Sequence, residues 1–203
     1  MAEKQSIKGK ILAIITLGLF VMIVLQFTMV VAGTKVNVQD SITIFAAIVA
    51  GPASGIIVGL IGGAHRIYLG DWSSLPSGLA TISAGIIGAY LWYKGYRIRN
   101  ITADKIGKVI ILVGLWEVVH TEVYVPLLGA KPLAEGFIIM TTNFMIPMVA
   151  VNMLGIGLFL LLCKDAIEAR KREEKMEHEI EKWRKVAEAL KMYRKVKKRR
   201  KDF

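Results

Sequence analysis

The sequence predicts an all-α integral membrane protein, a compact bundle of five to six transmembrane segments followed by a charged cytoplasmic helix. Hydrophobic residues make up 54% of the 203 residues, and the mean hydropathy is +0.50. These values exclude an ordinary soluble domain. Uncharged apolar runs recur between short polar loops, and the formal net charge of +11 gathers in a few segments. That distribution is typical of a multi-pass protein of the cell membrane.

The first apolar run, Ile11 to Ala32, holds 22 residues without a charge and follows a short basic N-terminus. It is long enough to span a hydrocarbon core of roughly 30 Å. It exceeds the usual apolar region of a signal peptide, and only a weak small-residue site follows it at Ala32-Gly33. We therefore expect a retained first span.

Residues 41–69 form the next apolar stretch, with Gly51-Pro52 near its middle. Proline and the residue before it interrupt helical geometry, so the stretch could be one kinked helix or two short ones. The segments rich in Lys and Arg, namely the N-terminus, 94–108 and everything after 164, should all be cytoplasmic. Two short segments, 38–50 and 52–69, followed by a span at 74–93, satisfy this requirement. Segment 38–50 is short enough to be re-entrant or heavily tilted.

A glycine ridge runs along segment 52–69, because glycines at 51, 55, 59 and 63 recur at every fourth position. Small residues on one helix face let helix backbones approach closely in lipid. The ridge ends in the pair His65-Arg66. An arginine at that depth must reach an interface, a partner or a water-filled cavity.

The remaining spans are predicted at about 106–126 and 136–163, which leaves both termini in the cytoplasm. Pro147 should kink the last of them. Residues 8–164 are thus expected to form one membrane domain.

Residues 165–203 differ in composition, since they are charged and lack proline. Apolar residues fall at spacings of four and three, which predicts a short heptad seam and a parallel homodimer; the seam is Met176, Ile180, Trp183, Ala187 and Leu190. A solvated helix lying against the membrane is the alternative. Glu181 and Lys185 should form a favourable i,i+4 pair.

The run Lys191 to Lys201 has eight basic residues and no acidic one, which favours anionic lipid headgroups over nucleic acid as its partner.

Polar residues within the apolar segments are predicted to converge in the outer leaflet as a pocket open to the outside. The expected ligand-binding residues are Arg66, His65, Ser77, Thr81, Glu117, His120, Asn143, Asn37 and Gln39. Arg66 could bind an anionic ligand bidentately, or Glu117 could neutralise it as a structural pair. Glu117 and His120 could instead share an interhelical hydrogen bond, and Ser77 and Thr81 could bond to their own helix.

No catalytic constellation accompanies these residues. Glu117 and His120 resemble an acid–base pair, but no nucleophile and no metal-ligand spacing stands beside them. The single cysteine, Cys163, carries no metal signature, and the glycine ridge is not a phosphate-binding loop because it lies in an apolar segment. We expect neither an enzyme active site nor a metal or cofactor.

Several ordered motifs resemble a known family. They are AGPASGIIVGLIGGAHRIYLG, then SGLATISAGIIGA, then Glu117-x-x-His120, and finally Pro147-Met148 followed by Asn152, Gly155 and Phe159. Over about residues 8–165 the chain resembles the membrane sensor domain of LytS/YhcK-type receptors, the 5TM-5TMR-LYT family. The resemblance implies a domain that senses a small external molecule, such as a small carboxylate, or the state of the envelope. It also implies a cytoplasmic output partner such as a histidine kinase.

Two features depart from that family. Its common Asn-x-Arg motif is Asn37-Val38-Gln39 here, so an amide replaces a second pocket arginine, and Ser77 stands where relatives often carry cysteine. About forty residues follow the membrane domain, too few for a kinase, so we expect either a truncated receptor or a stand-alone sensor that signals through a partner.

The glycine-proline, six-segment pattern also resembles the substrate-binding subunits of energy-coupling-factor vitamin transporters, whose length is similar. The pair His65-Arg66 and the long charged C-terminal helix argue against that alternative.

Overall fold

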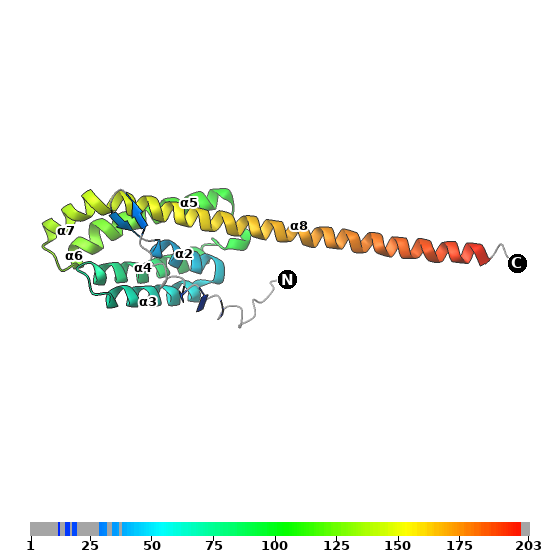
Figure 1. The fold of residues 1–203 in the computed structure, drawn as a ribbon, viewed down its shortest axis with the longest axis horizontal. Coiled ribbons are helices and arrows are strands. Elements are labelled where there is room, and N and C mark those ends of the chain that lie inside the picture. The colour runs from blue at the N-terminus through cyan, green and yellow to red at the C-terminus, as the bar shows by residue number, and fades with distance from the viewer. Residues whose placement is uncertain are drawn as a thin grey trace. The chain divides into compact units, whose positions relative to one another are not determined.

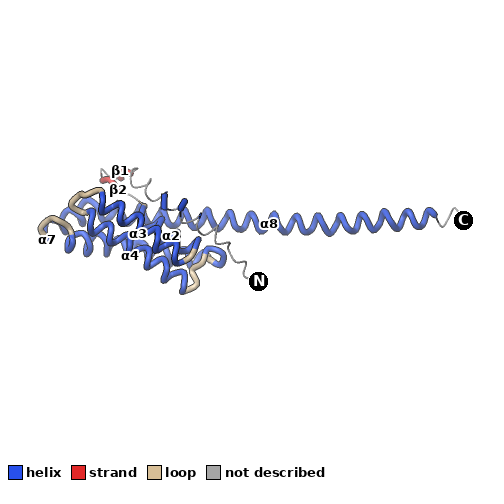
Figure 2. Tube along the Cα trace, turned by 90° about the horizontal axis from the view of Figure 1, so that it is seen from below, coloured by secondary structure: helices blue, strands red, loops and turns tan. Residues whose placement is uncertain are grey.

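The chain divides into two compact units, Met1–Leu162 and Cys163–Phe203. The computed structural model describes residues 38–199, two short strands before them, and the single positions 12, 15, 16, 18 and 19. The described part is almost entirely helical, with short loops between helices (Figures 1 and 2).

Helix α2, Gln39–Ala50, is the centre of the first unit. It packs against α3, Pro52–Tyr68, and α4, Ser74–Tyr93, and the three lie side by side in Figure 1. Nearly every residue of α2 is buried, including Ile44 and Ile48 at 0% exposure. After its polar first turn α2 is apolar apart from Thr43, and a helix of this kind must be covered on all sides. The short segment that the sequence left ambiguous is therefore the core of the unit.

The break between α2 and α3 lies at Gly51, whose φ of 106° falls in the left-handed region that glycine tolerates. Pro52 occupies the first helical position of α3, where its missing N–H costs nothing. The prediction of two short helices in place of one kinked helix is confirmed.

The glycine ridge of α3 allows the close approach that the sequence predicted. A Cβ at Gly63 would lie 2.5 Å from the carbonyl oxygen of Gly78 on α4, and one at Gly59 would lie 3.3 Å from the Cα of Gly85. The ridge also contacts α2, since a Cβ at Gly55 would collide with Ala47 of that helix. Small residues thus bring three helices together.

The rest of the first unit is a short 3₁₀ turn and two long interrupted helices. In chain order the elements are η1 (Ile98–Asn100), α5 (Ala103–Val119), η2 (His120–Tyr124), α6 (Val125–Leu128), α7 (Leu133–Ile139), η3 (Met140–Phe144) and α8 (Met145–Arg199).

The two π turns, η2 and η3, each precede a proline. The ring of proline clashes with the carbonyl four residues earlier, which for Pro126 is Glu122 in η2 and for Pro147 is Asn143 in η3. The extra residue of each turn absorbs that clash. The irregularity predicted at Pro147 therefore begins before the proline, at Met140.

Three described helices are long and apolar enough to cross a membrane: Ser74–Tyr93, Ala103–Leu128 and Leu133–Glu188. Helix α2 is apolar but shorter. The total of five to six spans and the cytoplasmic position of both termini stay predictions.

One expectation was wrong at the N-terminal side. Residues 29–31, assigned above to the end of the first span, form strand β1, Met29–Val31, which pairs antiparallel with β2, Thr34–Val36. The β-branched residues of both strands favour extended backbone over helix. Figure 2 shows this hairpin in red.

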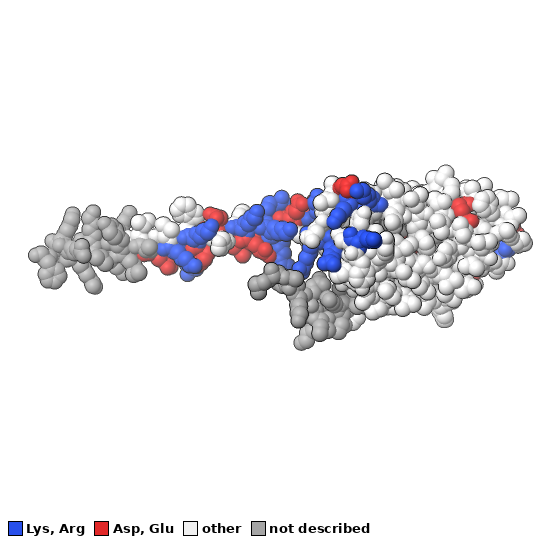
Figure 3. Space-filling model, turned by 180° about the vertical axis from the view of Figure 1, so that it is seen from behind, with Lys and Arg blue, Asp and Glu red and all other residues white. Residues whose placement is uncertain are grey.

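In the second unit, nearly all of the side chains that the structure describes are exposed. The predicted pair of Glu181 with Lys185 is confirmed at 3.9 Å, and Arg170 pairs with Glu174 in the same way. Figure 3 shows this unit covered by charges of both signs, whereas the drawn face of the first unit is largely uncharged.

Candidate functional site

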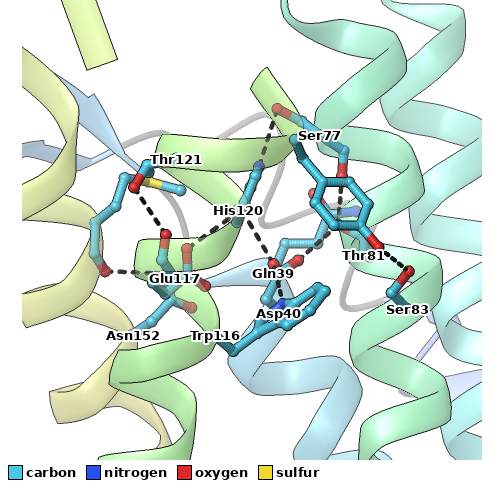
Figure 4. Close-up of polar contacts among 12 residues, drawn as sticks. Gln39, Asp40, Ser77, Thr81, Ser83, Trp116, Glu117, His120, Thr121 and Asn152 are labelled. Carbon is cyan, nitrogen blue, oxygen red and sulfur yellow. Dashed lines mark hydrogen bonds and ion pairs between the residues drawn. The ribbon is translucent and has the colours of Figure 1, made fainter. Parts of the chain in front are cut away.

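The candidate site is a buried cluster in which His120 lies between two carboxylates from different helices (Figure 4). His120 Nδ1 lies 3.3 Å from Asp40 Oδ2 and 3.3 Å from Glu117 Oε2. Asp40 comes from the first turn of α2, Glu117 from the last turn of α5, and His120 from the start of η2. The three side chains are 0–5% exposed, so the cluster is shielded from solvent.

Three further side chains orient this cluster. Thr81 Oγ1 donates to Asp40 Oδ1 at 2.6 Å, and Trp116 Nε1 donates to Asp40 Oδ2 at 3.2 Å. Ser77 Oγ lies 3.2 Å from His120 Nε2, the ring nitrogen that faces away from the carboxylates. Asp40 and His120 are therefore fixed in position by contacts from α4 and α5.

The local helix geometry also determines which groups face the cluster. Glu117 and His120 are three residues apart and therefore share a helix face. The π turn η2 begins at His120. Within it, Thr121 Oγ1 donates a hydrogen bond to the Glu117 carbonyl oxygen at 2.8 Å. Irregular π turns of this kind are frequent at functional sites.

A second buried polar contact joins α2 to α8. Ser41 Oγ lies 2.7 Å from the carbonyl oxygen and 2.7 Å from Oδ1 of Asn152, and its single proton is shared between these acceptors. Both residues are 0% exposed. Interhelical hydrogen bonds of this type stabilise membrane bundles, and Asn152 has the packing role that is typical of a polar residue on such a helix.

Arg66 lies at a different place, in the last turn of α3. Its Nη2 is 3.0 Å from Asp71 Oδ2 and donates to Ser73 Oγ at 3.1 Å. The suggestion that Glu117 neutralises Arg66 is wrong, because Glu117 pairs with His120 and Asp71 takes that role.

Asp71 is held in its charged form. Partial burial alone would raise the pKa of its carboxyl group, but the Arg66 guanidinium and hydrogen bonds from Ser73 and Ser74 outweigh burial and lower that pKa below its usual 3.8. Ser73 directly precedes α4, and Ser77 lies in the first turn of that helix. The start of α4 therefore contacts both Arg66 and the buried cluster.

The predicted site residues thus separate into groups. Four of them, Ser77, Thr81, Glu117 and His120, meet in the cluster. Gln39 is buried next to Asp40, whereas His65 is half-buried beside Arg66 in α3 and Asn143 is exposed in η3. Asn37 lies outside the described residues. Asp40 and Trp116 were missed, although a carboxylate at the first turn of an apolar helix is a signal that could have pointed to Asp40.

A separate apolar hollow of about 370 Å³ lies where α6 meets α7, with Leu127 and Phe137 among its walls. Glu122 borders it and accepts a hydrogen bond from Thr141 at 2.6 Å. The sequence analysis did not predict this hollow.

Comparison with known proteins assigns the family. The family described as "5TMR of 5TMR-LYT" matches residues 1–166, well over half of the chain. The chain belongs to this family.

Curated relatives of this 5TMR-LYT domain are sensor kinases and sensor proteins. The sensor histidine kinase BtsS of Escherichia coli (strain K12) is 26% identical over 157 residues, which is 77% of this chain and 28% of the relative. The sensor protein LytS of Bacillus anthracis is 31% identical over 129 residues, which is 64% of this chain and 20% of the relative. The chain thus spans less than a third of the length of each of these relatives, and the part that it covers is their sensor domain. No solved structure matches the chain.

Proposed function

We propose that this membrane sensor domain binds a small anionic ligand at Arg66 and signals through its C-terminal helix to a cytoplasmic histidine kinase. The observation that carries the proposal is the position of Arg66. It is the one arginine among the described residues of the apolar helices α2, α3 and α4, and its side chain is 20% exposed. A guanidinium so placed can present paired N–H donors to a carboxylate.

Asp71 and Ser73 would be the groups that a bound ligand displaces from the Arg66 guanidinium. Both contact the guanidinium of Arg66, at 3.0 Å and 3.1 Å. A ligand carboxylate would offer the same kind of oxygen acceptor as Asp71, and the exchange would free the loop that leads into α4. Ser77 and Thr81, one and two turns into α4, would pass the movement to Glu117 and His120.

The movement would then reach α8, which continues from the membrane-spanning residues into the second unit as one helix, Met145–Arg199. In this proposal His65 completes the site at Arg66, and the ligand roles of Asn143, Asn37 and Gln39 stay predictions from the sequence. In this proposal the protein resides in the plasma membrane with both termini in the cytoplasm, acts as a homodimer, and anchors its basic tail to anionic headgroups.

Ligand-dependent thermal stabilisation of the purified protein tests this proposal. The panel would hold small carboxylates, amino acids and vitamins, applied to wild type, Arg66→Ala and Asp71→Asn. Ligand at a hundredfold excess over its dissociation constant should add about 2.7 kcal/mol to the free energy of unfolding. A carboxylate should stabilise the wild type, lose its effect in Arg66→Ala, and bind at least as tightly to Asp71→Asn, because the competing carboxylate is gone.

Two outcomes would contradict the proposal. A carboxylate that stabilises Arg66→Ala as well as wild type would bind elsewhere. A vitamin as the only hit would favour the transporter-subunit alternative.

A further inference from the structure

The buried cluster of Asp40, Glu117 and His120 has a second property that ligand binding at Arg66 does not explain. One donor atom from each of the three side chains falls within 4.8 Å of the other two. The residues come from α2, α5 and η2, and two of them are 77 positions apart in the chain. The cluster is formed by folding and lies apart from the pair of Arg66 with Asp71.

The charges of this cluster do not balance. Asp40 and Glu117 are two acids, and His120 is the one basic side chain that pairs with them among the described residues. With both carboxylates ionised, even a charged imidazolium leaves one negative charge in excess. A buried uncompensated charge is strongly unfavourable. A divalent cation with a neutral imidazole would make the cluster electrically neutral.

An unused acceptor points to the same conclusion. Glu117 is 0% exposed, and its Oε1, the second oxygen of the carboxylate that faces His120, has no hydrogen-bond partner among the described residues. Buried carboxylate oxygens without a donor are rare and require an explanation. A cation bound by both oxygens of the Glu117 carboxylate would supply the missing partner.

Two of the three spacings between donor atoms match those around a small metal ion, and the third lies within 4.8 Å. Around a tetrahedral ion with bonds of about 2.0–2.1 Å, neighbouring ligand atoms lie ~3.3–3.4 Å apart. His120 Nδ1 lies 3.3 Å from each carboxylate oxygen. The same distances would also suit an imidazolium between an ionised and a protonated carboxyl group, so the unused oxygen of Glu117 is the observation that favours the cation.

The residues around the cluster match the supporting shell of metal sites. A metal-bound histidine normally hydrogen-bonds through its other ring nitrogen, and bound carboxylates are themselves hydrogen-bonded. Here His120 Nε2 faces Ser77 Oγ at 3.2 Å, so a proton on Nε2 leaves the Nδ1 lone pair directed at the carboxylates. Asp40 accepts from Thr81 and Trp116.

We propose that Asp40, Glu117 and His120 bind one divalent transition-metal ion of the Zn²⁺ type inside the membrane bundle. One imidazole nitrogen with two carboxylate oxygens suits zinc or manganese, whereas calcium requires six to eight oxygen ligands. The ion joins α2 to α5 at the position where Ser77 connects the cluster to the start of α4. The site does not depend on the proposed ligand at Arg66.

Metal binding to the full chain in detergent tests this proposal. The protein, freed of any polyhistidine tag and stripped with a chelator, is titrated with Zn²⁺ by calorimetry and with Co²⁺ by visible absorption. We expect one ion per chain and a Co²⁺ spectrum of low coordination number. Glu117→Gln and His120→Asn should each weaken binding more than tenfold.

Two variants guard against misfolding and non-specific effects. Glu122→Gln removes a neighbouring glutamate that does not belong to the cluster, and it should bind like wild type. Ser77→Ala keeps all three ligands but removes a supporting contact, and it should lower the affinity by about 10- to 100-fold.

If wild type binds no Zn²⁺ or Co²⁺, or if Glu117→Gln binds as tightly as wild type, the cluster is neutralised by protons and the proposal is wrong. Loss of carboxylate binding in Arg66→Ala with metal binding intact would separate this site from the ligand site.

Discussion

At the scale of single residues, the placement of charges decides what each buried group can do. Arg66 is paired with a partly exposed acid five residues away, whereas Glu117 and Asp40 share one histidine in the interior. Asp71, with 46% of its side chain exposed, is partly screened by water, and its pair with Arg66 contributes modestly to stability. The interior carboxylates lack that screening.

Asp71 should make the stability of the domain depend on pH in the acidic range. Its folded pKa lies below the unfolded value of 3.8, so its contribution is fully present above pH 3.8 and is lost as the pH falls through the folded value. Asp71→Asn should therefore be less stable than wild type near neutral pH, by about 1 kcal/mol or less. Unfolding measured from about pH 3 to pH 7 checks this expectation.

The control for Asp71 is the same substitution in an Arg66→Ala background. Without the guanidinium the difference between acid and amide should shrink to the part that the hydrogen bonds from Ser73 and Ser74 contribute. A difference between wild type and Asp71→Asn that grows toward low pH would contradict the argument.

At the scale of helices, the packing of the first unit depends on small residues and on two π turns. The α3 ridge meets α4 so closely that backbone atoms take part in the contact, as at Gly63 beside the carbonyl oxygen of Gly78. The π turns place their extra residues before Pro126 and Pro147. Helix α2 could be short because its neighbours cover it, and its polar first turn is satisfied by α4, α5 and α8.

Gly63→Ala should destabilise the bundle. Its Cβ would lie 2.5 Å from the Gly78 carbonyl oxygen, and relief requires the two helices to move apart. Overpacking of this kind costs about 1–3 kcal/mol. Thermal unfolding in detergent, followed by tryptophan fluorescence, measures the shift.

Gly107→Ala is the matched control, because a Cβ there would have nothing within 4 Å. Alanine has the higher helix propensity, so this variant should equal wild type or gain up to about 1 kcal/mol. Equal losses in both variants would show that helix contact at Gly63 is not the cause.

At the scale of the whole molecule, the second unit needs a partner to bury its apolar residues. Ile180 and Trp183 are 67% and 70% exposed, and Met176 and Leu190 are also exposed. A heptad seam of this kind is stabilised when a second copy packs against it. The dimer stays a prediction from the sequence, and the exposed seam is the surface that it would bury.

Cysteine crosslinking in the membrane tests the dimer. In a Cys163→Ser background, Ile180→Cys should form a disulfide-linked dimer, since seam residues face each other in a parallel pair. Lys185→Cys, on the opposite face of the helix, should crosslink far more slowly. Equal rates at the two positions would favour a solvated single helix.

The sequence by itself determined what depends on local pattern. The glycine-proline break gave two helices because proline and left-handed glycine act on the backbone directly. The glycine spacing predicted close helix contact, and the ordered motifs predicted the sensor family. The spacing of Glu117 and His120 placed them on one helix face, and a hydrogen bond between them was one of the alternatives that the sequence left open.

Tertiary structure alone decided which distant groups meet. Asp40 was not among the predicted site residues, and only the packing of α2 against its neighbours brings it to His120. Likewise, nothing in the sequence distinguished Asp71 from Glu117 as the partner of Arg66. Helical periodicity specifies on which face of its helix a residue lies, but it does not specify which other helix packs against that face. The charge imbalance at the centre of this domain therefore became visible only when three helices were placed together.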